Sequence, residues 1–91
     1  MNKKPNRVFR IRQWKFDYNF RSWRENHKGM RLLYDEERLF DKKMAQLARI
    51  CDKHNDAKNL SLAIVGEEFI DGEWNIITFH PENFDHKKIS S

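Results

Sequence analysis

The sequence predicts an α+β fold: a small single domain with an N-terminal strand and one long amphipathic helix packed on a small antiparallel sheet with a C-terminal hairpin. Three patterns predict it. Apolar and basic residues alternate over residues 8–12, apolar residues recur at spacings of three and four over 39–51, and Asp-Gly at 71–72 separates two apolar runs. The 91 residues, 13% of them aromatic, supply enough bulky apolar area for one folded domain.

The chain divides into three predicted parts. Residues 1–6 are polar and basic and predict a flexible basic arm. Residues 7–84 hold the periodic patterns and predict the single α+β domain. Residues 85–91 follow Pro81, which ends the last strand, and predict a mobile tail.

The first predicted element is a half-buried strand that begins at Arg7. Phe9 and Ile11 fall on one face of this strand, and Arg10 and Arg12 fall on the other. We therefore expect one face to contact the core and the other to carry positive charge.

Two interpretations fit residues 17–28. Phe16, Phe20 and Trp23 stand at i, i+4 and i+7, with Asp17 as an N-cap and Gly29 as a C-terminal stop, which predicts a short helix. We favour this helix because Trp23 fits it and interrupts an alternating pattern.

The alternative for the same segment is a continued strand. The aromatic residues from Trp14 to Phe20 keep a period of two on the parity opposite to Phe9, which requires a bulge near Gln13. In this version residues 26–29 form a hairpin turn that leads into a strand over residues 30–34.

The second predicted element is an amphipathic helix of about five turns from about Glu36 to His54. Glu36 and Glu37 occupy its first turn, where the helix dipole favours negative charge, and no Gly or Pro interrupts it. Its apolar stripe consists of Leu39, Phe40, Met44, Leu47, Ala48 and Cys51.

The last predicted element is a β-hairpin centred on Asp71-Gly72. A two-residue turn places Ile70 opposite Glu73, Phe69 opposite Trp74 and Ile64 opposite Phe79. In this register four apolar residues share the face that we assign to the helix: Leu62, Ile64, Ile77 and Phe79. Gly66 is a position where a bulge changes the phase and brings Phe69 and Trp74 to the same side.

The charge of the chain is strongly asymmetric. Residues 1–31 carry ten basic and two acidic side chains, a net of +8, whereas residues 32–91 carry eight basic and twelve acidic ones, a net of −4. Basic residues interleave with aromatic ones in the N-terminal third, which is typical of proteins that neutralise phosphates and stack on unpaired bases. The competing interpretation is an arginine-rich outer face beside a buried aromatic core.

The leading functional hypothesis is therefore a small non-enzymatic nucleic-acid-binding protein, with DNA and RNA both compatible. The predicted contacts are Arg10, Arg12, Lys15, Arg21 and Arg24 to phosphates, with Trp14 and Trp23 as stacking residues.

The alternative hypothesis is a protein-binding regulator or inhibitor of the kind that phages and mobile elements encode. Its partner, for example a nucleic-acid enzyme, is engaged through an acidic hairpin with aromatic anchors. The predicted contact residues are Glu67, Glu68, Phe69, Asp71, Glu73 and Trp74.

Other functional classes are poorly supported by the sequence. Three glycines exclude a nucleotide-phosphate loop, and no serine lies in a Gly-flanked nucleophile turn, so we expect no enzyme and no cofactor. Cys51, with His54, His80 and His86, is better explained by core packing and surface positions than by a metal site. The longest apolar run covers residues 62–65 and no signal-like stretch precedes it, which predicts a cytoplasmic protein without a membrane span.

Overall fold

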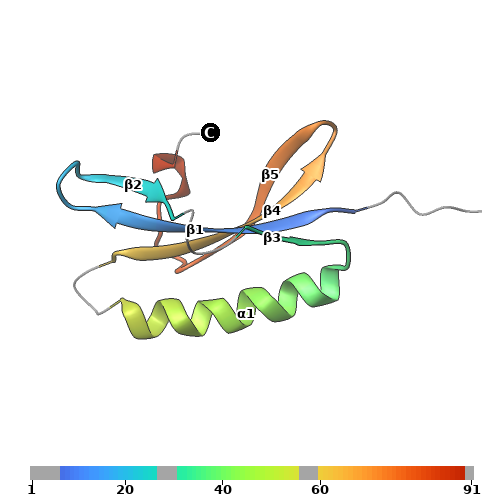
Figure 1. Cartoon of the computed structure of the whole chain (residues 1–91), viewed down its shortest axis with the longest axis horizontal. Helices are drawn as coiled ribbons and strands as arrows, with labels where there is room; N and C mark the ends of the chain where they lie inside the picture. The colour runs from blue at the N-terminus through green and yellow to red at the C-terminus, as the bar shows by residue number, and fades with distance from the viewer. Residues whose placement is uncertain (1–6, 27–30, 56–59, 90–91) are drawn as a thin grey trace, which may run out of the picture.

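One face of a five-stranded antiparallel sheet is covered by a single helix in the computed structural model, which describes residues 7–26, 31–55 and 60–89 (Figure 1). This arrangement confirms the predicted α+β fold. In chain order the elements are β1 (Phe9–Asp17), β2 (Ser22–Glu25), β3 (Arg31–Tyr34), α1 (Glu37–His54), β4 (Leu62–Ile70), β5 (Glu73–His80) and the short 3-10 turn η1 (His86–Lys88).

β1 is the central strand of the sheet. One of its edges pairs with β4, which in turn pairs with β5. Its other edge pairs with two strands in succession, because β3 lies opposite residues 9–12 and β2 lies opposite residues 14–17. Residues distant in the sequence are thereby brought beside the basic N-terminal strand.

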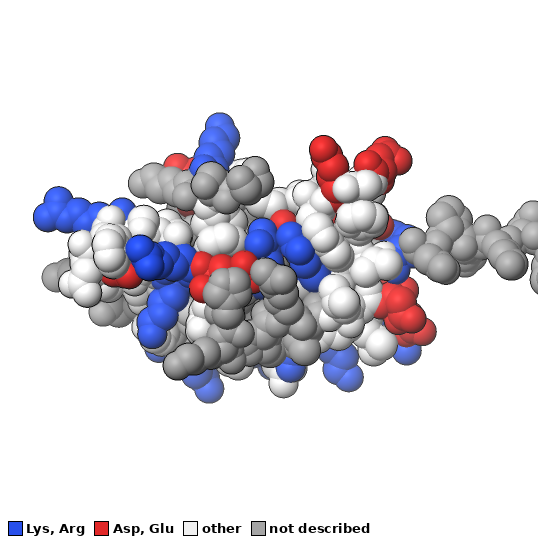
Figure 2. Space-filling model, turned by 45° about the horizontal axis from the view of Figure 1, so that its top comes forward, with Lys and Arg blue, Asp and Glu red and all other residues white. Residues whose placement is uncertain are grey.

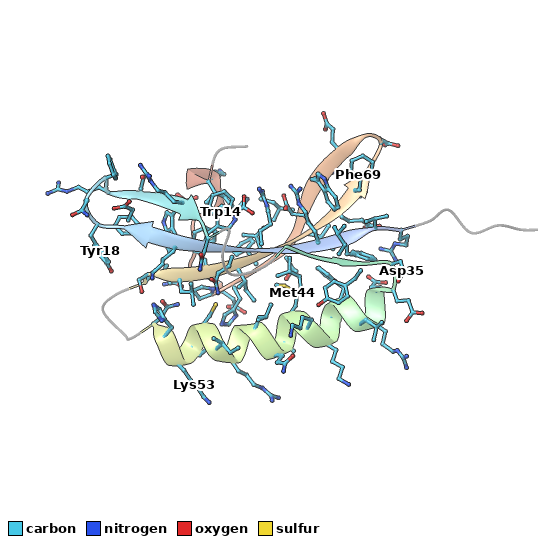
Figure 3. All side chains as sticks on the ribbon, in the orientation of Figure 1. Trp14, Tyr18, Asp35, Met44, Lys53 and Phe69 are labelled. Carbon is cyan, nitrogen blue, oxygen red and sulfur yellow. The ribbon has the colours of Figure 1, made fainter. Side chains whose placement is uncertain are left out.

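Helix α1 begins one residue after the predicted start and ends at the predicted residue. Phe40, Met44, Leu47 and Cys51 are buried against the sheet, as the stripe predicts, whereas Leu39 is 42% exposed. Figure 3 shows Met44 between α1 and the sheet and Lys53 on the opposite side of α1. The core on this side is completed by Phe9 and Ile11 from β1 and by Leu62 and Ile64 from β4, together with partly buried Tyr34 and Ala48.

The helix favoured for residues 17–28 is wrong, because β1 runs to Asp17 and a turn leads into β2. Trp23 lies opposite Phe16 in this hairpin. No bulge occurs at Gln13 in the described chain, since the pairing of β1 with β4 is continuous. The alternative strand over residues 30–34 is confirmed as β3, and residues 27–30 lie outside the described residues.

The apolar residues of β1 change from one face of the strand to the other because a second apolar layer lies on the face opposite α1. Phe9 and Ile11 face α1, whereas Trp14 faces the other side of the sheet. There it forms a cluster with Ala63 and Val65 of the neighbouring strand β4, and Phe84 and Ile89 from the C-terminal segment complete this cluster. Because the chain after β5 folds back over this face, β1 is buried first on one side and then on the other (Figure 1).

The C-terminal segment, for which the sequence predicts a mobile tail over residues 85–91, packs on the sheet as far as Ile89. Residues His86–Lys88 form η1, and the Asp85 side chain accepts a hydrogen bond from the backbone N–H of Lys87 at 3.2 Å. Ile89 is 7% exposed and belongs to the second apolar cluster.

The predicted turn at Asp71-Gly72 is confirmed, with φ of +51° and +81° at the two residues. Ile70 lies opposite Glu73 and Phe69 opposite Trp74, as predicted. The register then shifts between Gly66 and Glu67, at the position where the sequence allows a bulge.

This shift corrects the outer half of the predicted register. Ile64 lies opposite His80 instead of Phe79. Leu62 and Ile64 contact the helix side, as predicted, but Phe79 packs with the second cluster and Ile77 is 43% exposed. A single extra residue in β5 therefore moves Phe79 to the opposite face.

Candidate functional site

The basic residues predicted to bind nucleic acid fall into two separate groups. Arg10 and Arg12 lie in the middle of β1 on the face opposite α1. Lys15, Arg21 and Arg24 lie in the hairpin formed by β1, β2 and their turn. The two groups differ in exposure and in the residues that they contact.

Arg10 and Arg12 share one buried carboxylate. Glu67 is 3% exposed, and its Oε1 accepts hydrogen bonds from Arg10 Nε at 2.7 Å and from Arg12 Nε at 2.8 Å. Its Oε2 accepts a further hydrogen bond from Arg12 Nη2 at 3.2 Å. Arg12 Nη1 donates to Glu25 Oε1 on β2, also at 3.2 Å. A buried carboxylate is costly unless it is paired, and this network supplies the pairing.

Strand register creates this network. Glu67 lies directly opposite Arg10 in the pairing of β4 with β1, so the two side chains emerge on the same face. The sequence assigns Arg10 and Arg12 to one candidate surface and Glu67 to another. The structure brings the two surfaces together.

Each of these arginines also lies over an indole ring. The Arg10 guanidinium carbon is 4.2 Å from the centre of the Trp74 ring, and that of Arg12 is 5.0 Å from Trp14. A groove of about 470 Å³ opens here and is lined by Arg10, Arg12, Glu67, Glu73 and Trp74. On this side of the molecule basic and acidic side chains lie next to one another (Figure 2).

The two predicted stacking residues are largely covered. Trp14 is 8% exposed, and its Nε1–H has no hydrogen-bond acceptor among the described residues. Trp23 is partly buried, 4.8 Å from Phe84 and 5.4 Å from Phe16 between ring centres. Both rings pack beneath the C-terminal segment.

The turn between β1 and β2 exposes two other aromatic rings. Tyr18 is 61% exposed and Phe20 is 65% exposed. Asp17 shapes the turn, because its Oδ1 accepts hydrogen bonds from the backbone N–H groups of Asn19 and Phe20 at 2.9 and 3.3 Å. Figure 3 shows Tyr18 at this end of the sheet.

Cations surround these rings. Arg24 stacks over Phe20 at 4.2 Å and forms a longer ion pair with Asp17 at 3.5 Å, while 57% of its side chain stays exposed. Lys15 and Arg21 are exposed, and a shallow pocket of about 410 Å³ lies along this hairpin between Lys15 and Asn26. Sequence reasoning missed Tyr18 and Phe20 as contact residues, because the period-two alternative kept both rings within a continued strand instead of in an exposed turn.

The second predicted surface, at the β4–β5 hairpin, is only partly available. Glu67 is internal, and Glu68 pairs with Arg7 at 2.7 Å, a hydrogen bond that lowers the pKa of the Glu68 carboxyl. Asp71 and Glu73 are exposed at the tip. Phe69 is 45% exposed and packs edge to face against Trp74 at 5.2 Å.

The described residues hold no cluster of three or more His, Cys, Asp or Glu side chains that could bind a metal ion. His80 Nε2 lies 2.7 Å from Asp52 Oδ1, and His86 packs against Phe79. Within the described ranges, no helix is long and apolar enough to cross a membrane. No protein-family description, curated protein or solved structure matches this chain.

Proposed function

We propose that the protein is a small, non-enzymatic nucleic-acid-binding protein and that its β1–β2 hairpin binds single strands. The observation that carries the proposal is the placement of two exposed aromatic rings, Tyr18 and Phe20, among three cations that the protein does not bury. The cations are Lys15, Arg21 and Arg24.

The exposed rings and the cations of this hairpin contribute to binding in different ways. An exposed ring contributes about 1–3 kcal/mol when a base stacks on it, whatever the base. The cations contribute through release of the ions condensed on the phosphates, with a salt slope of about −0.7 per contact on a single strand. Three contacts give an affinity loss of about 20-fold between about 50 and 200 mM salt.

Fluorescence anisotropy with labelled thymidine and uridine oligonucleotides tests this proposal. We expect Tyr18→Ala with Phe20→Ala to weaken binding by about tenfold or more. Arg21→Ala with Arg24→Ala should weaken binding and flatten the salt dependence.

The matched control is Lys42→Ala with Arg49→Ala, which removes the same charge from exposed positions on α1. If this control weakens binding as much as the hairpin variants do, the binding is a non-specific effect of net charge. Absence of binding at about 50 mM salt would also refute the proposal.

A second candidate function is that of a protein-binding regulator or inhibitor. It is favoured by the Phe69 and Trp74 ring pair on a hairpin that rises from the sheet on the side opposite α1 (Figure 1). Under this hypothesis Phe69→Ala releases a partner that the wild-type chain retains after nuclease treatment, whereas Ile77→Ala, equally exposed on β5, does not.

A further inference from the structure

We propose that the groove beside Trp74 is a binding site for a carboxylate of a partner protein and that Arg10 is its main hydrogen-bond donor. This inference goes beyond nucleic-acid binding by the β1–β2 hairpin and involves different residues. It rests on the position of the Arg10 guanidinium, on its unused donors and on the charge of the groove.

The Arg10 side chain is held in place before any ligand arrives. Its Nε donates to the buried Glu67 carboxylate at 2.7 Å, its guanidinium stacks on Trp74, and only 15% of the side chain is exposed. A fixed guanidinium loses little conformational entropy on binding, which favours affinity at a small site.

The other end of the Arg10 guanidinium is unused within the described parts of the chain. Neither Nη1 nor Nη2 of Arg10 has a hydrogen-bond acceptor there, although the groove passes this side chain. Arg12 differs, because its Nε and Nη2 donate to Glu67 and its Nη1 donates to Glu25. Arg10 therefore keeps a planar pair of donors for an oxyanion.

The charge of the groove selects among oxyanions. Arg10 and Arg12 balance Glu67 and Glu73 among the residues that line the groove, so the formal charge of the lining is zero. A ligand with one negative charge is tolerated here, whereas the second negative charge of a phosphate monoester is repelled by the Glu73 carboxylate.

Shape favours a carboxylate over a phosphodiester. A guanidinium fork binds a carboxylate or a phosphate in the same bidentate geometry, so the neighbouring rings decide between the two ligands. One face of Trp74 is already covered by Arg10, and Phe69 packs against the ring at 5.2 Å, so this groove offers little surface on which a base could stack. An aspartate or glutamate side chain, or a chain terminus, fits these features.

A titration of the full chain with sodium acetate, at ionic strength held constant with sodium chloride, tests the site. The side-chain N–H signals of Arg10 and Trp74 are followed by two-dimensional NMR. We expect both signals to shift and saturate, and we expect Arg10→Lys to weaken the apparent affinity by about tenfold or more. Lysine keeps the charge opposite Glu67 but loses the donor pair.

Arg24→Lys is the matched control, because Arg24 also stacks on an aromatic ring and pairs with a carboxylate. It should leave the acetate response unchanged, and backbone spectra verify that both variants fold. A response that never saturates, or one that persists in Arg10→Lys, would overturn the proposal. A shift with dimethyl phosphate but none with acetate would also overturn it and assign the groove to a phosphodiester. Since the titration contains no oligonucleotide, its failure leaves the hairpin proposal unaffected.

Discussion

Gly66 on β4 lies directly beneath the ring of Phe40 on α1. A Cβ atom at position 66 would collide with Phe40 Cζ and would come within 2.8 Å of Thr78 Cγ2. Phe40 is 1% exposed and stacks on Phe9 with ring centres 4.9 Å apart, so its ring has no free space into which to move. The close approach of the helix to the sheet therefore depends on the missing side chain at this position.

Gly66→Ala should consequently destabilise the protein. Overpacking a well-filled core costs about 1–3 kcal/mol, and the fixed Phe40 ring places this substitution towards the upper end. Urea unfolding measures the change. Gly72→Ala is the control, because no atom lies within 4 Å of the added Cβ and only the backbone strain at φ +81° opposes it, at about 1 kcal/mol. Equal costs at the two positions would contradict the steric explanation.

Removal of the carboxylate shared by Arg10 and Arg12 should also be costly. Glu67→Gln leaves two partly buried guanidiniums without their common anion, and breaking a buried pair in this way costs about 3–5 kcal/mol. We expect about 3 kcal/mol in urea unfolding, because both arginines retain some contact with water.

Glu68→Gln, at the adjacent position, is the control for this substitution. Its partner Arg7 is half exposed, so we expect a much smaller loss of stability. The Arg7 hydrogen bond lowers the pKa of Glu68, and its stabilising contribution is therefore present above the ordinary value of 4.5 and is lost as the pH falls through the lower folded-state value. A Glu67→Gln cost no larger than that of Glu68→Gln would mean that Glu67 is not the anchor of the two arginines.

The elements of the fold were predictable because each depends on a local pattern. The spacing of Phe40, Met44, Leu47 and Cys51 defines the buried side of α1, and Asp71-Gly72 defines the turn. The helix wrongly favoured after Asp17 shows the limit of such patterns. The aromatic residues there fit two periodicities, and the choice between them depends on Phe84 and Ile89, which are more than 60 residues further along the chain.

The candidate site was less predictable, because it depends on which strands become neighbours. Nothing near Arg10 in the sequence indicates that Glu67 lies opposite it, 57 residues away. The basic residues in the sequence therefore predicted more unpaired positive charge on β1 than the folded protein has, because Arg10 and Arg12 are paired with Glu67. Tyr18 and Phe20 were missed because the sequence pattern did not show that the chain turns at residues 18–21, where both rings are exposed.

The Cys51 thiol should make stability fall in alkaline solution. Burial, with a smaller contribution from the adjacent Asp52 carboxylate, raises the pKa of Cys51 from 9.0 to about 11. Between these values only the unfolded chain loses the thiol proton, so the unfolded state is favoured as the pH rises. Urea unfolding of the wild type and of Cys51→Ala should therefore show that the stability of the wild type falls more between about pH 8 and pH 10.5.

Thiol labelling provides an independent measurement for Cys51. The folded chain should react slowly with a thiol reagent at about pH 8, and the chain in urea should react rapidly. Parallel stability changes in the wild type and Cys51→Ala, together with rapid labelling of the folded protein, would contradict the buried position of this residue.

The C-terminal segment should contribute as much to stability as a core strand does. Phe84 is 2% exposed, and its ring centre is 4.8 Å from that of Trp23 and 6.3 Å from that of Phe79. Phe84→Ala removes these contacts and should cost about 3–5 kcal/mol, a large part of the stability of a domain of this size. Ile77→Ala, at a 43% exposed position on β5, should cost less than about 1 kcal/mol. If the two variants unfold at the same urea concentration, the segment does not cover Trp14 and Trp23 in solution, and both indole rings become available for stacking on bases.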